Sequence, residues 1–116
     1  MSAVVEQYVS GLKARNFSNI PFTDDVIFDG IMDQVQGRAA FLALCEQFFG
    51  MVSAVRVLDV HARETSATVV YEFDSPAGTI PIVDVLTIRD GAISKAKPYF
   101  NPLPLIELQK AAQGQG

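Results

Sequence analysis

The sequence has no tryptophan, one histidine and one cysteine among its 116 residues. Its single cysteine, Cys45, cannot form an intramolecular disulfide and fits a reducing compartment such as the cytoplasm. Cys45 and the lone histidine, His61, cannot complete a zinc site, and the carboxylates are not clustered at ligand spacing. We therefore expect a cytoplasmic protein that uses no metal or other cofactor, with Cys45 as a small core residue of a helix.

Basic clusters and long apolar segments are also missing. Nine Lys and Arg residues stand against 13 Asp and Glu residues, which gives a formal net charge of −4. Because no basic patch is available to neutralise phosphates, nucleic acid binding is not expected. Charged residues interrupt every apolar run, so no membrane-spanning segment is predicted. Residues 1–6 lack a basic region followed by an apolar one, so no signal peptide is predicted either.

The sequence shows no serine nucleophile motif, no glycine-rich phosphate loop and no metal motif. What it does have is apolar residues: 49% of the chain is hydrophobic and only 19% is charged. A chain of this length forms one domain with a proper core. So apolar a composition suits a domain that has an internal cavity or a dimer interface as well as a core.

Hydrophobic periodicity predicts two helices in the first half of the chain. The first begins after a cap at Ser2 and ends around residues 13–16, and the second begins at Gly37 and ends near Gly50. Between them we expect at most one short helical turn within residues 17–22, then a short strand and an irregular loop. That strand is predicted over residues 26–29, and the loop continues through residue 36.

After the second helix the hydrophobic period shortens to about two residues, which is typical of strands. Four strands are predicted, over residues 53–63, 66–74, 79–89 and 92–101. Helices followed by an antiparallel meander indicate an α+β fold in which a curved sheet wraps a helix. Residues 1–108 are predicted to form a single domain, and residues 109–116 a polar tail that frays.

The most unusual residue in these strands is Asp84, within the segment IPIVDVLTI. Strand alternation places it on the same face as Ile80, Ile82, Leu86 and Ile88, where it is the only polar side chain. A buried carboxylate is unfavourable unless it is paired, hydrogen-bonded or protonated. Alternation alone leaves three interpretations open. Asp84 could be a functional carboxyl, a structural one held by backbone amides at a bulge near Pro81, or a carboxyl that points outward because the register is shifted by one residue.

Two further residues are candidates for a site. Asp29 ends the first predicted strand, and its local sequence also fits an ordinary turn. Tyr8 lies on the apolar stripe of the first helix, where a buried hydroxyl needs a partner but packing alone would also explain it. By the same alternation, His61 and the two lysines of residues 95–97 are expected at the surface.

With its predicted elements and candidate residues in this order, the chain resembles the nuclear-transport-factor-2-like superfamily, in particular its SnoaL-like and ketosteroid-isomerase-like branches. The resemblance runs from about Val4 to Pro104. It rests on the following segments: FTDDVIFD (22–29), QGRAAF (36–41), IVDVLTI (82–88), RDG (89–91) and PYFN (98–101). It implies a cone-shaped α+β fold, with N-terminal helices packed in a curved, mostly antiparallel sheet.

The resemblance also implies roles for residues. In ketosteroid isomerases the general base matches Asp29, and an oxyanion hole pairs a tyrosine matching Tyr8 with a protonated carboxyl matching Asp84. Phe100 matches a pocket aromatic. The other residues expected to bind substrate are Ile82, Leu86 and Phe22. The two tyrosines that support the oxyanion hole in those enzymes are replaced here by Phe22 and Cys45, which puts a steroid substrate in doubt.

The function expected from the resemblance is cofactor-independent proton transfer next to a carbonyl, in an isomerase or cyclase acting on a small hydrophobic, ring-containing compound. The alternative is a non-catalytic module of the same fold that binds a hydrophobic ligand or dimerises. A homodimer formed through the outer face of the sheet is expected in either case. An aromatic residue, Tyr71 or Tyr99, is expected on that face.

Overall fold

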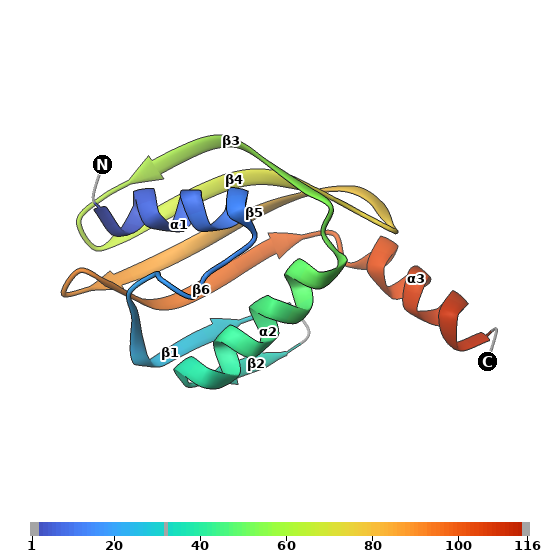
Figure 1. Ribbon diagram of the computed structural model, residues 1–116, viewed down its shortest axis with the longest axis horizontal. Helices are drawn as coiled ribbons and strands as arrows, with labels where there is room; N and C mark the ends of the chain where they lie inside the picture. The colour runs from blue at the N-terminus through green and yellow to red at the C-terminus, as the bar shows by residue number, and fades with distance from the viewer. Residues whose placement is uncertain (1–2, 32, 115–116) are drawn as a thin grey trace.

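The computed structural model describes residues 3–31 and 33–114, so the predicted cap at Ser2 lies outside the described residues. Within these residues, three helices and six strands follow one another (Figure 1). In order they are α1 (Ala3–Ala14), β1 (Phe22–Asp29), β2 (Gln34–Gln36), α2 (Arg38–Met51), β3 (Ala54–Ala62), β4 (Ser66–Ser75), β5 (Gly78–Arg89), β6 (Ala92–Phe100) and α3 (Leu103–Gly114). The fold is α+β, as predicted.

The predicted helices and the four long strands are confirmed with ends within two residues of those expected. Before residue 37, two features differ from the prediction. Strand β1 begins at Phe22 rather than Val26, and the short strand β2 lies within the predicted loop. The stretch between α1 and β1 forms turns and no helix, which agrees with the prediction of at most one helical turn there.

The largest difference is α3, which continues through the predicted polar tail as far as Gly114. Two prolines precede and begin this helix, and the backbone N–H of Leu103 donates to Asn101 Oδ1 at 3.1 Å. Such an Asn side chain satisfies an otherwise unpaired donor at the start of a helix. The Ala, Gln, Lys and Leu residues that follow have high helix propensity, so a polar composition did not prevent helix formation here.

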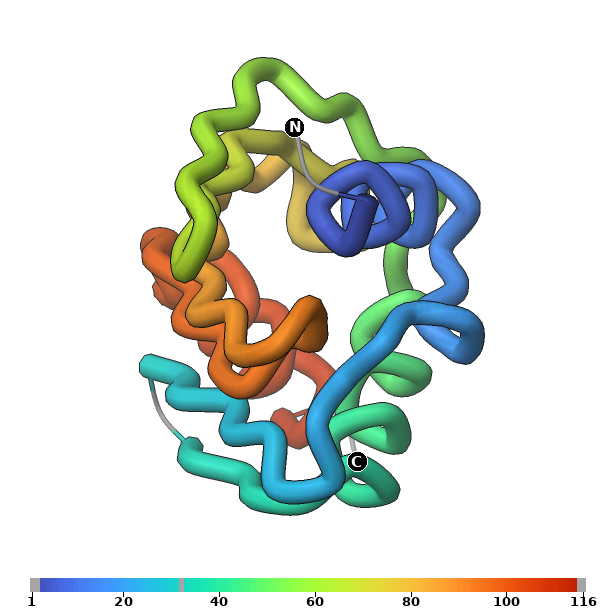
Figure 2. Tube along the Cα trace, turned by 90° about the vertical axis from the view of Figure 1, so that its left-hand side faces the viewer, coloured from blue at the N-terminus to red at the C-terminus, as the bar shows by residue number. Residues whose placement is uncertain are grey.

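The six strands form one curved sheet in the order β2-β1-β6-β5-β4-β3. All neighbours are antiparallel except β1 and β6, which are parallel. Helices α1 and α2 lie against the same face of this sheet, and Figure 2 shows the sheet curving around them. Helix α3 follows β6 and extends away from the rest of the molecule (Figure 1).

Strand β5 has the alternation predicted for it. Ile80, Ile82, Asp84, Leu86 and Ile88 are all buried, and the residues between them are more exposed. Pro81 pairs in regular register with Glu72 and causes no bulge. It is tolerated because the pairing of β5 with β6 reaches only as far as Ile82 opposite Phe100, so β5 has one neighbour at Pro81. The register of β5 thus turns Asp84 toward the helices.

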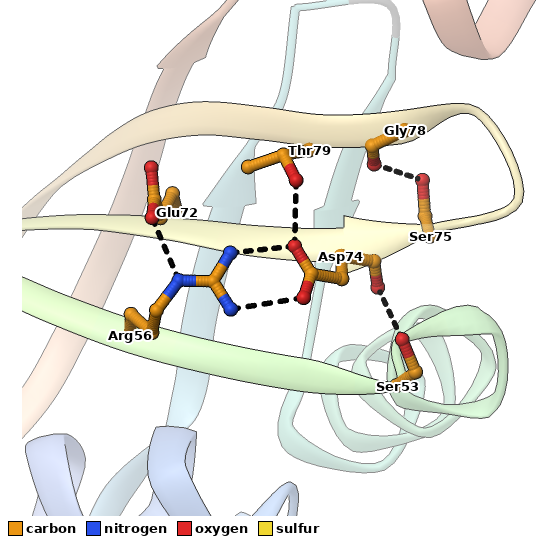
Figure 3. A network of polar contacts seen from close by, with 7 residues as sticks. All are labelled: Ser53, Arg56, Glu72, Asp74, Ser75, Gly78 and Thr79. Carbon is orange, nitrogen blue, oxygen red and sulfur yellow. Dashed lines mark hydrogen bonds and ion pairs between the residues drawn. The ribbon is translucent and has the colours of Figure 1, made fainter.

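The opposite face of the sheet carries a polar network that joins β3, β4 and β5 (Figure 3). Arg56 on β3 donates to Glu72 and Asp74 on β4, with 2.7 Å between Arg56 Nε and Glu72 Oε1. Thr79 on β5 donates to Asp74 Oδ1 at 2.7 Å. Arg56 lowers the pKa of Asp74 to about 2. The network links three strands whose inward residues form much of the core.

Candidate active site

A cavity of about 170 Å³ lies between the concave face of the sheet and the helices. Apart from two tyrosines, one aspartate and one cysteine, its walls are hydrocarbon. The lining residues are Tyr8, Leu12, Phe17, Phe28, Phe41, Leu44, Cys45, Phe48, Tyr71, Phe73, Ile82, Asp84, Ala96, Pro98, Phe100 and Leu105. A polar group in such a wall is a candidate for function, because burying it is unfavourable unless it finds a partner.

The polar part of the wall is a three-residue cluster centred on Asp84, which is only 5% exposed. The hydroxyl of Tyr8 donates to Asp84 Oδ2 at 2.6 Å, and the hydroxyl of Tyr71 donates to the same oxygen at 2.9 Å. No described residue donates to the second oxygen, Oδ1, which is not fully enclosed by protein atoms. One carboxylate oxygen is therefore held by two tyrosines, and the other has no donor among the described residues.

Burial determines the charge state of this cluster. Desolvation raises the pKa of Asp84 to about 6, although the hydrogen bonds from Tyr8 and Tyr71 lower it in part. Burial, together with the charge of Asp84, raises the pKa values of Tyr8 and Tyr71 well above their ordinary value. Both tyrosines therefore remain protonated donors. Asp84 changes charge close to neutral pH, in the range suited to acid/base chemistry.

Each member of the cluster comes from a different element. Tyr8 is on α1 and packs on Phe17, with 4.8 Å between the ring centroids. Asp84 lies opposite Val69 in the β4–β5 pairing, and Tyr71 lies two residues farther along β4 on the same face. The cluster therefore ties α1 to the middle of the sheet.

The prediction that Tyr71 lies on the outer face of the sheet is wrong. Tyr71 is 3% exposed and contributes to the cavity wall. The sequence contained a signal for this position, because Tyr71 alternates in phase with the apolar Val69 and Phe73 and out of phase with Glu72 and Asp74. Tyr99, by contrast, is 51% exposed on the outward side, as predicted.

The structure does not bring Asp29 into the cavity with Tyr8 and Asp84. Alternation along β1 turns Phe28 inward, so Asp29 points to the outer side. Its Oδ2 lies 3.7 Å from the Nζ atoms of both Lys95 and Lys97. These lysines extend from the outward side of β6, as predicted. The general-base role that the resemblance implies for Asp29 requires its side chain to face the same cavity as the oxyanion-hole residues. This placement is wrong, because β1 turns Phe28 rather than Asp29 toward the cavity.

The four residues predicted to bind substrate divide into two pairs. Phe100 and Ile82 line the cavity. Leu86 and Phe22 do not, which corrects the prediction. Leu86 is fully buried farther along β5, and Phe22 packs on Phe41, with 4.7 Å between the ring centroids. Both residues belong to the core that supports the cavity.

With this geometry established, comparison with known proteins identifies the family. The sequence pattern of the SnoaL-like domain matches residues 5–96, which is most of the chain. The chain belongs to the SnoaL-like domain family. None of the curated proteins matches it at a significant level.

Solved structures confirm the nuclear-transport-factor-2-like fold. A crystal structure from Kribbella flavida is similar with a TM-score of 0.85 and 22% identity, over 97% of this chain and 95% of that one. An NTF2-like protein of unknown function from Cytophaga hutchinsonii has a TM-score of 0.75 and 19% identity, over 89% and 91% of the two chains. A second Kribbella flavida protein, provisionally named a ketosteroid isomerase, has a TM-score of 0.75 and 19% identity, over 85% and 76%. Identities this low show the fold alone.

In this SnoaL-like protein, Cys45 on α2 is partly buried and lines the cavity. Burial, with a smaller effect from the charge of Asp84, raises the pKa of its thiol to about 12. It is therefore a neutral thiol at physiological pH and a poor nucleophile. Its contribution to the cavity is packing.

Outside the cavity of this SnoaL-like chain, the described residues show one exposed histidine and no metal-ligand cluster. His61 is exposed beside Asp59, with 3.0 Å between His61 Nε2 and Asp59 Oδ2, and lies at the surface as predicted. Over residues 3–31 and 33–114, no three His, Cys, Asp or Glu side chains gather as metal ligands. Within the same residues, no helix has both the length and the apolar character needed to cross a membrane.

Proposed function

We propose that this SnoaL-like protein binds a small apolar carbonyl compound in the cavity and that Asp84 moves a proton at a carbon next to the carbonyl. One observation supports this most strongly: Asp84 lies in an apolar wall, with Oδ2 held by two tyrosine hydroxyls and Oδ1 without a donor among the described residues. The reaction class is an isomerisation or cyclisation that needs no cofactor. The similarity to the Kribbella flavida protein provisionally named a ketosteroid isomerase is consistent with this class.

The environment of Asp84 suits a general base. Its pKa of about 6 leaves it mostly ionised at pH 7, yet makes it a stronger base than an ordinary aspartate. The two hydrogen bonds to Oδ2 fix the plane of the carboxylate and so direct Oδ1. A fixed orientation lowers the entropic barrier to attack on a bound C–H group.

Proton transfer would also free a donor for the substrate. When Oδ1 takes a proton from the α-carbon, the electron pair of that C–H bond moves into an enolate and Asp84 becomes neutral. Hydrogen bonds to a neutral carboxyl are weaker than those to a carboxylate. Tyr8 or Tyr71 can then donate to the enolate oxygen, and one such donor in a dry site is worth about 3 kcal/mol.

The cycle closes without a second protein acid. The proton held on Oδ1 passes to the γ-carbon, the double bond moves into conjugation, and Asp84 returns to its carboxylate form. Asp29 has no part in this cycle because it lies outside the cavity, beside Lys95 and Lys97. In this proposal Asp84 is the acid/base residue, which differs from the oxyanion-hole role implied by the family resemblance.

A second candidate function is ligand binding without turnover. The observation favouring it is that the described wall contains one carboxylate, whereas the ketosteroid-isomerase arrangement uses two. A ligand hydroxyl could then donate to Asp84 Oδ1 with no further chemistry. Asp84 is essential to both functions, so the two are separated by a rate measurement rather than by a binding measurement.

The test is an absorbance assay for conjugation of a β,γ-unsaturated cyclohexenone. We expect the wild type to accelerate the reaction and Asp84→Asn to lose about a hundredfold or more in rate, as for loss of a general base. Asp29→Asn is the matched control, with the same chemical change outside the cavity, and should keep the wild-type rate. Saturable binding of the ketone without acceleration would favour the binding function. Equal loss in the two variants would contradict the role of Asp84.

A further inference from the structure

We infer that Leu105 on α3 limits the length of the cavity and restricts it to ligands of one ring. This inference rests on the proposed function only in placing the ligand in the same cavity, and it does not depend on proton transfer. It concerns which substrates can enter rather than what happens to them. Leu105 would be a specificity-determining residue and has no catalytic role.

The size of the cavity sets the first limit. At about 170 Å³ it is close to an engineered apolar cavity of about 150 Å³ that binds benzene. Close-packed walls do not yield to larger groups without strain. One six-membered ring therefore fits the cavity, whereas two fused rings require a wall to move.

Most of the wall cannot move without disturbing the core. Phe41 and Phe73 are each 1% exposed, and both pack against other aromatic rings. Leu12 on α1 is equally buried. Enlarging the cavity at any of these residues would break contacts that hold the helices against the sheet.

The wall formed by α3 is different. None of the described residues of α3 is buried, and its Leu103 and Leu108 are 57% and 36% exposed. Leu105 is the one residue of this helix in the cavity wall, where it packs against the core. Only Asn101 and Pro102 separate the end of β6 at Phe100 from this helix, and Phe100 and Leu105 both line the cavity. This wall has the fewest interactions to lose.

Asp84 determines which polar group the ligand can carry. Its Oδ1 is an acceptor without a partner among the described residues, and both neighbouring hydroxyls already donate to Oδ2. A ligand that carries one hydroxyl on a single ring satisfies both limits. Phenol is the simplest probe of this kind, and β-naphthol is the same probe with a second fused ring.

The experiment is calorimetric titration of the wild type, Leu105→Ala and Leu108→Ala with phenol and with β-naphthol. We expect the wild type to bind phenol and to bind β-naphthol much more weakly. Leu105→Ala removes three carbon atoms from the wall and should improve β-naphthol affinity by about tenfold or more, since buried carbon adds to affinity. Leu108→Ala removes the same atoms outside the cavity and should leave both affinities unchanged.

Two results would overturn the inference. One is equal affinity of the wild type for phenol and β-naphthol. The other is an equal gain in β-naphthol affinity for both leucine variants. Retained phenol binding by Leu105→Ala shows that the variant is folded. Because only binding is measured, the size limit can hold even if the ketone assay finds no proton transfer, and it can fail while that assay succeeds.

Discussion

The hydroxyl of Tyr71 donates a 2.9 Å hydrogen bond to Asp84 Oδ2, from the neighbouring strand and on the cavity side of the sheet. Tyr8 donates to the same oxygen from α1. Two donors on one oxygen stabilise the carboxylate form and leave the other oxygen to the cavity. This arrangement makes a buried aspartate tolerable in an apolar wall while keeping it chemically accessible.

Replacing Tyr71 should change the acidity of Asp84. Tyr71→Phe removes a donor that favours the charged form, so the pKa of Asp84 should rise from about 6, by about 1. Carbon-13 NMR titration of the Asp84 carboxyl measures this directly. Tyr99→Phe, at an exposed site on the outer face, is the control and should leave the pKa of Asp84 unchanged. An unchanged pKa in Tyr71→Phe would contradict the hydrogen bond.

The raised pKa of Asp84 also predicts how stability depends on pH. An unfolded aspartate titrates near 3.9, whereas folded Asp84 titrates at about 6. Between these values the folded state binds a proton that the unfolded state does not, so this group contributes stability in acid that is lost as pH rises through 6. The Asp84→Asn variant has no titratable carboxyl at this position, so its stability lacks this contribution to pH dependence.

The free energy of unfolding of the wild type should therefore fall relative to that of Asp84→Asn by about 2–3 kcal/mol between pH 4 and pH 8. Chemical denaturation of both proteins at the two pH values gives this difference, and the contributions of other groups cancel. A difference that stays constant with pH would mean that Asp84 has an ordinary pKa in the folded protein.

Two helical glycines should respond in opposite ways to alanine. A Cβ atom at Gly11 on α1 would lie 2.8 Å from the carbonyl oxygen of Asn16 and 2.7 Å from Ile20 Cδ1, so Gly11→Ala should destabilise the protein. A Cβ at Gly50 on α2 meets no atom within 4 Å. Gly50→Ala should therefore stabilise the protein by up to about 1 kcal/mol through helix propensity. Thermal unfolding of both variants checks this, and two changes of the same sign would contradict it.

The sequence was most informative where the two faces of a strand differ in polarity. Along β5 the alternation of Ile80, Ile82, Asp84, Leu86 and Ile88 predicted the inward face, and the structure confirms it. In β1 both Ile27 and Phe28 are apolar, so residue types alone could not show which phase faces the cavity. The placement of Asp29 failed for that reason.

The sequence pattern could not predict contacts between residues that are far apart in the chain. Tyr8 and Asp84 are 76 residues apart, and their contact depends on how α1 packs in the curved sheet. The contribution of Tyr71 depends on the register between β4 and β5. Helix α3 was missed because its polar composition was given more weight than its helix propensity. The homodimer stays a prediction, with Tyr99 an exposed aromatic on the outward face.

The most direct test of the role of Asp84 is the pH dependence of kcat/KM for the β,γ-unsaturated cyclohexenone. If Asp84 is the base, the rate should rise with pH through a midpoint near 6, the pKa of its carboxyl. Asp29→Asn should give the same profile. A midpoint near the ordinary aspartate value of about 4, or a rising limb that survives in Asp84→Asn, would contradict the account.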